Sequence, residues 1–300
     1  MHADEVHTDV ALVRRLLAAQ FPQWAELPIA PVESAGTDNA IYRLGDDMSV
    51  RLPRIHWATG QVEKERRWLP TLAPLLPLAV PVPLAKGVPG EGYPWDWGVH
   101  QWLRGENPAV GYRGELRRVA VDLAGFITAL QRVDPAGGPL AATENLRGMP
   151  LAVRDASTRA AIAAARAFVD ADADAATVAW EAALQAPEWD GAPVWFHGDL
   201  LPGNLLLEDG QLRAVIDFSG LGVGDPACDL MSAWGLFTGE SREVFRSAVA
   251  LDDATWVRAR GHALSQALMF IPYYWETNPL GVKRAQRAVD EILAEHSRNS

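Results

Sequence analysis

The feature that most constrains this chain is a set of polar residues at the ends of short apolar runs between residues 194 and 230. The first run leads into His197, Asp199 and Asn204, which form the pattern H-x-D-x-x-x-x-N. A second apolar run ends at Asp217, eighteen residues after Asp199. Carboxylate and amide oxygens are the hard ligands that a divalent cation such as Mg²⁺ prefers. The spacing predicts a loop that presents Asp199 and Asn204 to one site, with Asp217 delivered by the next strand.

The first hundred residues are predicted to be rich in strands. Apolar residues at helical spacing indicate a helix over residues 10–19, and a second helix is expected over 60–69. Ala40–Leu44 and Met48–Leu52 are apolar runs separated by Gly45 and two aspartates, which predicts two antiparallel strands and a tight turn. Further strands are expected at Val82–Leu84 and Trp97–Leu103.

The remainder is predicted to be mostly helical. Helices are expected over residues 116–130, 156–186 (one or two), 226–237, 253–270 and 282–296, with a short strand and a small hairpin in 194–217. The fold class is therefore α+β, with a small β-rich lobe over residues 1–103 and a larger helical lobe over 104–300.

Charge and cysteine content exclude several classes of protein. The chain has 38 acidic and 27 basic residues and a net charge of −11, so a nucleic-acid partner is not expected. A chain of 300 residues buries enough apolar surface to fold without disulfides, and its one cysteine, Cys228, suits a reducing cytoplasm. The seven histidines include no ligand-spaced pair, so zinc is not expected.

One uncharged stretch has nearly the length of a membrane span. Residues 68–85 carry no charge but include five prolines, which a spanning helix cannot accommodate. We expect a buried, extended connection there and no membrane partner. The acidic N-terminus lacks the basic region of a signal peptide, which again favours a cytoplasmic location.

The segment from 194 to 230 resembles the catalytic and metal-binding loops of the protein-kinase-like superfamily. Its H-G-D form, together with the downstream G-D-P-A-x-D-L, is similar to the aminoglycoside phosphotransferase family. The resemblance implies a two-lobed protein-kinase-like fold. It also implies an Mg²⁺-dependent enzyme that moves the γ-phosphate of ATP or GTP to a hydroxyl of a small molecule.

The resemblance assigns roles to the loop residues. Asp199 is the expected catalytic residue, which orients the acceptor hydroxyl and accepts its proton. His197 belongs to the same catalytic loop, where we expect it to support Asp199 rather than react. Asn204 and Asp217 are the expected metal ligands. Asp225 and Asp229, near a predicted helix start, are expected to have supporting roles.

The resemblance also predicts the nucleotide-binding residues of the first lobe. Gly36, Thr37 and Asn39 lie where the family has its phosphate-covering loop, which here has a single glycine. The lysine of the family is replaced by Arg51, and Glu65 is its expected helix partner, with Glu63 the alternative. Gln101 and Leu103, in the strand His100–Leu103, are expected beside the nucleotide base.

The acceptor is left open by the sequence. An aminoglycoside or other antibiotic is favoured over a metabolite such as choline, homoserine or a ketosamine, and a nucleotide-binding pseudokinase is a further alternative. Six acidic residues against one basic residue between 197 and 230 give a weak preference for a cationic acceptor. Trp234, Trp256 and Trp275 are candidates to line its pocket. A protein kinase is excluded because Pro226 follows Asp217 too closely for an activation loop. The oligomeric state is left open.

Overall fold

The computed structural model describes residues 5–32, 38–108, 112, 114–141, 146–168 and 172–299. The chain divides into two compact units, the first formed by Met1–Pro74 and Ala79–Arg104 and the second by Leu75–Leu78 and Gly105–Ser300. Each unit is described by itself. Together they confirm the predicted α+β class.

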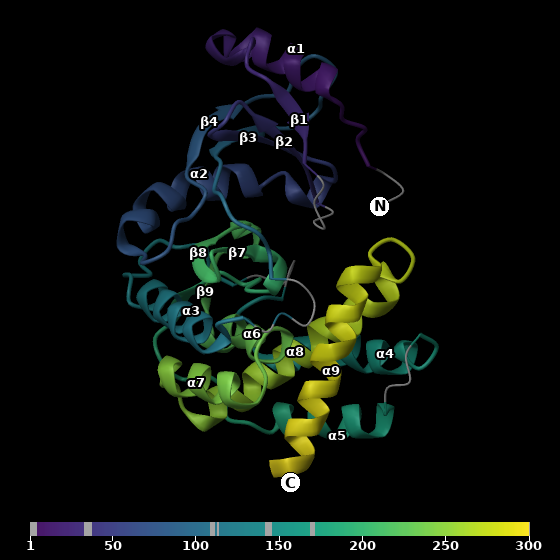
Figure 1. Cartoon of the computed structure of the whole chain (residues 1–300). Coiled ribbons are helices and arrows are strands. Elements are labelled where there is room, and N and C mark those ends of the chain that lie inside the picture. Colours follow the sequence, from purple (N-terminus) through teal and green to yellow (C-terminus); the bar gives the residue numbers. More distant parts are fainter. Residues whose placement is uncertain are drawn as a thin grey trace. The chain divides into compact units, whose positions relative to one another are not determined.

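The first unit is built on an antiparallel sheet of five strands in the order β1-β2-β3-β5-β4. Its strands are Ile29–Pro31 (β1), Asn39–Leu44 (β2), Met48–Pro53 (β3), Pro83–Gly87 (β4) and Trp97–Gln101 (β5). Its helices are Val10–Gln20 (α1) and Gln61–Leu72 (α2), and they lie on opposite sides of the sheet (Figure 1). Asp9 caps α1 by accepting a hydrogen bond from the Leu12 amide at 2.7 Å.

Alternate side chains of β3 point to opposite faces of the sheet, one face covered by α1 and the other by α2. Val50 and Leu52 are fully buried in a core with the apolar residues of α1. Arg51 points to the other face, where it contacts α2. One strand therefore supplies both the core of the first unit and a charged side chain for its helix-covered face.

The second unit is mostly helical (Figure 1). Its helices are Leu116–Gln131 (α3), Asp155–Ala165 (α4), Ala173–Leu184 (α5), Ser232–Gly235 (α6), Gly239–Val249 (α7), Asp253–Tyr274 (α8) and Pro279–Asn299 (α9). Its strands form two pairs, β6 (Val194–Phe196) with β9 (Gly222–Gly224) and β7 (Leu205–Glu208) with β8 (Gln211–Val215). Helix α8 is buried over most of its length, so the other helices pack around it.

The two strand pairs place the polar loops. Strand β6 ends immediately before His197, and β8 ends two residues before Asp217. The β7–β8 hairpin turns at Asp209 and Gly210, both of which have positive φ. The residues that the sequence singled out thus lie at strand ends and in short connections.

Several elements differ from the sequence-based expectation. Helix α2 continues through Pro70 to Leu72, so the uncharged stretch begins as a helix rather than an extended connection. That stretch is also not buried throughout, since Leu75 and Leu84 are 55% and 49% exposed. Among the described residues, no helix is long and apolar enough to cross a membrane.

Three further differences concern short or weakly patterned elements. Helix α7 was not expected, because only Phe245 and Val249 of its apolar residues are buried. The strands β1 and β9, three residues each, were also missed. The helix expected over 226–237 is a 3₁₀ segment, Pro226–Met231, followed by the single turn of α6.

Candidate active site

The loop after β6 is held in one conformation by its own backbone. Gly198 has φ of 83°, and a Cβ there would lie 2.6 Å from the Gly220 carbonyl oxygen, so only glycine fits. The Asp199 amide donates to His197 Nδ1 at 3.1 Å. His197 Nε2 lies 3.0 Å from the Ile216 carbonyl oxygen and, since Nδ1 accepts, it is the nitrogen that donates.

The His197 ring is therefore neutral, and it links two backbone segments inside the protein. Its side chain is fully buried, and this burial lowers its pKa. Both ring nitrogens are occupied by backbone groups of the two segments that carry Asp199 and Asp217. The supporting role of His197 in the reaction stays a prediction.

Asp229 holds the backbone of the same loop through its carboxylate. Its two carboxylate oxygens accept the amides of His197 and Gly198, each at 2.7 Å. Complete burial raises the pKa of Asp229 to about 7, although the two amides act in the opposite direction. Asp229 touches backbone of the loop and is a positioning residue.

Asp225, at the start of the same 3₁₀ segment, is equally enclosed. It caps the segment through the Ala227 amide at 2.9 Å and receives two hydrogen bonds from the Arg258 guanidinium at 2.8 and 3.2 Å. Both partners are nearly buried. Between Asp225 and Asp229 lies Cys228, which is buried as well.

The Asp199 carboxylate is held on three sides. Its Oδ1 accepts from Arg147 Nη2 at 3.0 Å and from Gln266 Nε2 at 2.9 Å, while Oδ2 accepts from Asn204 Nδ2 at 2.9 Å. The side chains of Arg147 and Asp199 are 24% and 18% exposed. The carboxylate is thus fixed in direction but still reached by solvent, as a group that acts on a substrate must be.

Asn204 and Asp217 offer the remaining oxygen donors. The Asn204 amide nitrogen donates to both the carbonyl and the carboxylate of Asp199, which leaves its Oδ1 as the atom suited to a cation. Asp217 has the left-handed conformation (φ 64°, ψ 72°) and accepts from the Ser219 amide. One amide oxygen and one carboxylate fit Mg²⁺, which typically takes few protein ligands and completes its shell with phosphate and water. Within the described ranges there is no cluster of three or more His, Cys, Asp or Glu residues for a metal.

The first unit contains a buried ion pair at the position expected from the sequence. Arg51 Nη1 contacts Glu65 Oε1 and Oε2 at 3.0 and 3.2 Å. His100 Nε2, on β5, lies 3.1 Å from Glu65 Oε2, a neighbour that we did not expect. The alternative, Glu63, is exposed and instead pairs with Arg66 and Lys86. These two cations lower its pKa to about 2.

The other expected nucleotide-binding residues are placed as follows. Asn39 is buried and donates to Gln61 at the start of α2. Gln101, which is exposed, ends β5, and Leu103 follows it. Gly36 and Thr37 lie outside the described residues.

Two of the tryptophans proposed for the acceptor pocket belong to the core. The indoles of Trp234 and Trp256 both donate to Glu295, at 2.9 and 3.0 Å, and both rings are buried. A buried tryptophan needs a partner for its N–H, and here a carboxylate of α9 supplies it. Trp275 is 39% exposed and is the only one of the three at the surface.

Sequence reasoning missed Arg147 and Gln266 as partners of Asp199. Arg147 lies 52 residues before it, outside any motif, and Gln266 lies 67 residues after it on α8. Arg284 on α9 was missed too, and its Nη1 comes within 3.5 Å of a Cβ position at Gly203. No local pattern marks such residues, because the fold alone brings them to the loop.

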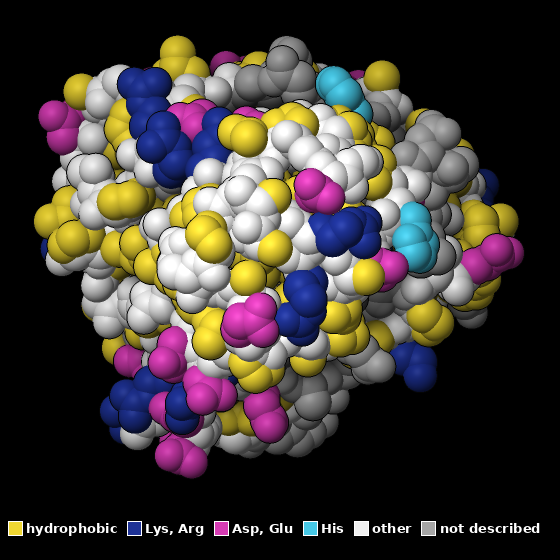
Figure 2. Space-filling view, turned by 90° about the horizontal axis from the view of Figure 1, so that it is seen from above, with side chains coloured by type: hydrophobic (Ala, Val, Ile, Leu, Met, Phe, Trp, Pro, Cys, Tyr) yellow, Lys and Arg dark blue, Asp and Glu magenta, His cyan; other side chains and the backbone are white. Residues whose placement is uncertain are grey.

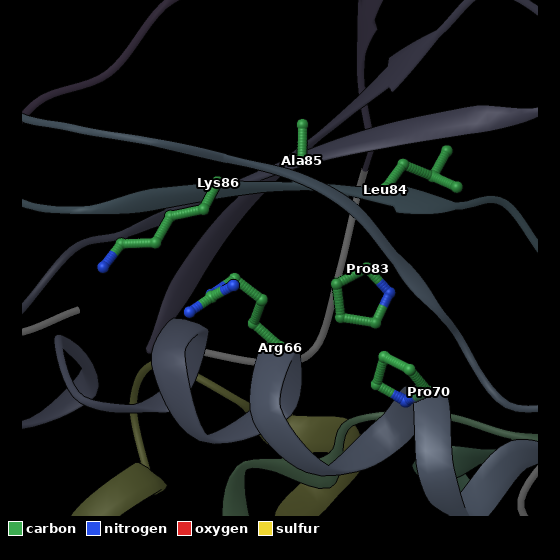
Figure 3. Close-up of a pocket in the computed structure, with 6 residues that line it drawn as sticks. All are labelled: Arg66, Pro70, Pro83, Leu84, Ala85 and Lys86. Carbon is green, nitrogen blue, oxygen red and sulfur yellow. The ribbon is translucent and has the colours of Figure 1, made fainter.

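A separate hollow of about 520 Å³ lies on the first unit between α2 and β4 (Figure 3). Its lining includes Arg66 and Lys86, which point toward one another from the helix and the strand. Both are already paired with Glu63, and Lys86 also with Asp96 at 2.7 Å. None of its lining residues belongs to the polar set described above, so we assign no function to this hollow.

Comparison with known proteins identifies the family. The model of the phosphotransferase enzyme family matches residues 30–264, which include both the Arg51 strand and the Asp199 loop. The chain belongs to this family. It is a small-molecule phosphotransferase, as the sequence predicted.

Solved structures of related phosphotransferases share the fold at low sequence identity. The GDP complex of aminoglycoside 2'-phosphotransferase-IIIa is 16% identical with a TM-score of 0.75, covering 96% of this chain and 100% of that one. The macrolide 2'-phosphotransferase MphH from Brachybacterium faecium is 24% identical with a TM-score of 0.60, covering 94% and 97%. A streptomycin–ATP complex of APH(2")-IIa is 16% identical with a TM-score of 0.60, covering 93% and 95%. A comparison with curated protein sequences gave no match.

Proposed function

We propose that this phosphotransferase moves the γ-phosphate of ATP or GTP to a hydroxyl group of an antibiotic-like small molecule, with Mg²⁺. The observation that carries the proposal is the Asp199 carboxylate, which Asn204 holds on the loop that precedes Asp217. A carboxylate for the hydroxyl and two oxygen donors for a cation are the groups that phosphoryl transfer requires.

In the proposed reaction, the acceptor hydroxyl donates a hydrogen bond to Asp199. The new bond forms between the hydroxyl oxygen and the γ-phosphorus, and the bond from that phosphorus to the bridging oxygen of the nucleoside diphosphate breaks. Asp199 takes the hydroxyl proton, and the diphosphate leaves with the bonding electron pair. Because this transition state is loose, fixing the direction of the carboxylate matters more than a strong base.

Asn204 and Asp217 are the proposed ligands of Mg²⁺, which when bound neutralises charge on the phosphate oxygens. His197 and Asp229 act through the loop backbone and do not touch the reacting atoms. We assign nucleotide binding to the lobe predicted over residues 1–103. Its proposed binding residues are Gly36, Thr37, Asn39, Arg51, Gln101 and Leu103. Glu65 orients Arg51.

The acceptor class is supported by the relatives named above, which include aminoglycoside and macrolide phosphotransferases. Their bound nucleotides, GDP in one and ATP in another, leave both nucleotides as candidates. A buried single cysteine and a nucleotide-dependent reaction suit the cytoplasm.

The test is a coupled assay of nucleoside diphosphate release, run with ATP and with GTP against aminoglycosides, macrolides and amino alcohols. We expect acceptor-dependent release that requires Mg²⁺. Asp199→Asn should reduce kcat by about 10²- to 10⁴-fold while nucleotide binding, measured by calorimetry, is retained.

Asp209→Asn is the matched control, since Asp209 is an exposed carboxylate in the nearby hairpin turn. It should leave the rate unchanged. Equal rates for Asp199→Asn and the wild type would refute the catalytic assignment. Nucleotide binding without release for any acceptor would instead favour the pseudokinase.

A further inference from the structure

The charges around the Asp199 loop are more nearly balanced than the sequence suggested. Asp199 is paired with Arg147, and Asp225 is paired with Arg258. Asp229 is enclosed and bonded to backbone amides. The remaining acidic residues of the segment are Asp217, which is proposed for the metal, and Glu208 and Asp209, which are exposed at the hairpin turn.

Two arginines also flank the loop. Arg147 contacts Asp199 directly, and its side chain lies over the Gly198 and Gly220 backbone, within 3.0 to 3.2 Å of the Cβ positions there. Arg284 reaches Gly203 and donates to the Pro108 carbonyl at 2.7 Å. An acceptor with several ammonium groups would approach Asp199 against these positive charges.

An aromatic surface continues from Asp199 along α8. Gln266, which contacts Asp199, is followed at helical spacing by Phe270 and Tyr274 on the same face, and all three are half-buried. The rings of Phe270 and Tyr274 stack with centroids 4.3 Å apart, and Tyr273 meets Tyr274 at 4.6 Å.

This surface rests on α9, and exposed side chains border it. A Cβ at Gly281, in the first turn of α9, would lie 2.6 Å from Phe270 Cζ, so the ring rests directly on the α9 backbone. Tyr273 is 56% exposed, and Leu280 on α9 is 50% exposed. Exposed aromatic side chains grouped beside a polar site are typical of a ligand surface.

We propose that the α8 face from Gln266 through Phe270 to Tyr274 binds the acceptor, and that Arg147 selects hydroxylated acceptors with an apolar face and few positive charges. This inference rests on the proposed function and narrows its acceptor class. It reverses the preference for a cationic acceptor that the acidic residues of the sequence suggested. Arg147 then has two tasks, since it positions Asp199 and sets the local charge.

The test compares two acceptors of antibiotic size, kanamycin with several amines and a macrolide with at most one. The wild type should have the higher kcat/KM for the macrolide. Arg147→Gln should lower both rates because Asp199 loses a partner, yet raise the kanamycin-to-macrolide ratio about tenfold, since one repelling charge is removed. Loss of Asp199 positioning lowers both rates alike, so a change in the kanamycin-to-macrolide ratio reports the effect of the Arg147 charge on acceptor choice.

Phe270→Ala should raise the KM for the macrolide about tenfold and leave the KM for the nucleotide unchanged. Arg117→Gln and Val178→Ala are matched controls, because both side chains are exposed on the second unit and belong to neither the loop nor the α8 face. Neither should change the acceptor ratio or the acceptor KM.

Calorimetric titration of each acceptor, with ADP or GDP present, keeps the test independent of turnover. A preference for kanamycin, an unchanged ratio in Arg147→Gln, or equal macrolide binding by Phe270→Ala and the wild type would overturn the inference. So would the absence of macrolide binding. Failure of the proposed function would give a different result from failure of this inference. In that case Asp199→Asn would keep the wild-type rate, or no acceptor would be phosphorylated.

Discussion

The ion pair between Arg51 and Glu65 combines a contribution to stability with the binding role that we propose for Arg51. The side chains of the pair are 10% and 2% exposed, so each charge contributes to compensating the other inside the protein. A lysine in this position would offer a point charge, whereas arginine presents a planar fork that also reaches phosphate oxygens. The replacement therefore preserves a cation beside Glu65 while changing the geometry that it offers a nucleotide.

Arg51→Met should lower the free energy of unfolding by about 3–5 kcal/mol, because it removes the cation that contacts both carboxylate oxygens of the buried Glu65. Urea unfolding followed by circular dichroism measures the change. Arg51→Lys keeps the charge and should recover much of the loss. Arg66→Met, which removes the cation of an exposed pair on the same helix, should move the midpoint far less. Similar midpoints for Arg51→Met and Arg66→Met would contradict the buried pair.

At the scale of elements, the 3₁₀ segment Pro226–Met231 supports the loop that carries Asp199 through the Asp229 carboxylate. Asp229→Ala would leave the amides of His197 and Gly198 without acceptors, at a cost of about 1–3 kcal/mol each. We expect a lower unfolding midpoint together with a reduced kcat and a nearly unchanged KM for the nucleotide. A wild-type kcat in a destabilised Asp229→Ala protein would show that the loop does not depend on this anchor.

The same carboxylate makes the stability depend on pH. Its pKa is about 7 in the folded chain against about 4 when unfolded, so between these values the folded chain binds the additional proton. The stability that this group contributes therefore falls as the pH rises from about 4 to about 7. Asp229→Asn removes this titration, so the stability difference between wild type and variant should be larger at pH 5 than at pH 8. An equal difference at both values would show that Asp229 does not titrate in this window.

The elements themselves were largely predictable where their periodicity is strong. The strands β2 and β3 and the helices α1, α3, α8 and α9 lie close to the expected ranges because their apolar residues repeat at the spacing of a buried face. Helix α7 has too few buried apolar residues to show such a repeat, and β9 has three residues, two of them glycine. The five prolines of residues 68–85 were expected to lie in an extended connection, yet the first of them, Pro70, lies in the last turn of α2.

The candidate site was predictable only in its local part. His197, Asp199, Asn204 and Asp217 lie within 21 residues and form a recognisable pattern. The side chains that fix Asp199, from Arg147 and Gln266, come from segments that only tertiary packing brings together. Sequence spacing holds no record of these contacts, so the acceptor side that we propose depends on the structure alone.

At the scale of the whole molecule, the net charge of −11 arises from 38 acidic and 27 basic residues. On the face seen in Figure 2, basic side chains lie interspersed with acidic ones. With a net charge of −11, the absence of a nucleic-acid partner stays a prediction from the sequence. Buried titratable groups also make the stability of the molecule depend on pH.

His262, in the middle of α8, is the clearest of these groups. Its ring is buried, its two nitrogens have no hydrogen-bond partner in the part of the chain that the structure describes, and burial lowers its pKa to about 3. The unfolded chain takes up this proton near pH 6.5, so the stability is intact above that value and is lost as the pH falls toward 3, by up to about 1.4 kcal/mol per pH unit.

His262→Phe should therefore flatten the decline in the free energy of unfolding between pH 6.5 and pH 4.5, measured by urea titration at several pH values. His56→Gln, at an exposed position of the first unit, is the control and should leave the decline unchanged. Parallel curves for His262→Phe and the wild type would show that His262 does not govern the acid sensitivity.

The enclosure of Cys228 has a practical consequence for labelling. The chain has one thiol, which is 2% exposed, and burial raises its pKa well above the usual value, so maleimide reagents should leave it unmodified while the chain is folded. Cysteines introduced at exposed positions, for example His56→Cys in the first unit and Val178→Cys in the second, would then accept spin labels or fluorophores without removal of Cys228. Pulsed electron resonance or energy transfer between these probes would report how the separation of the two units changes when nucleotide and acceptor are added.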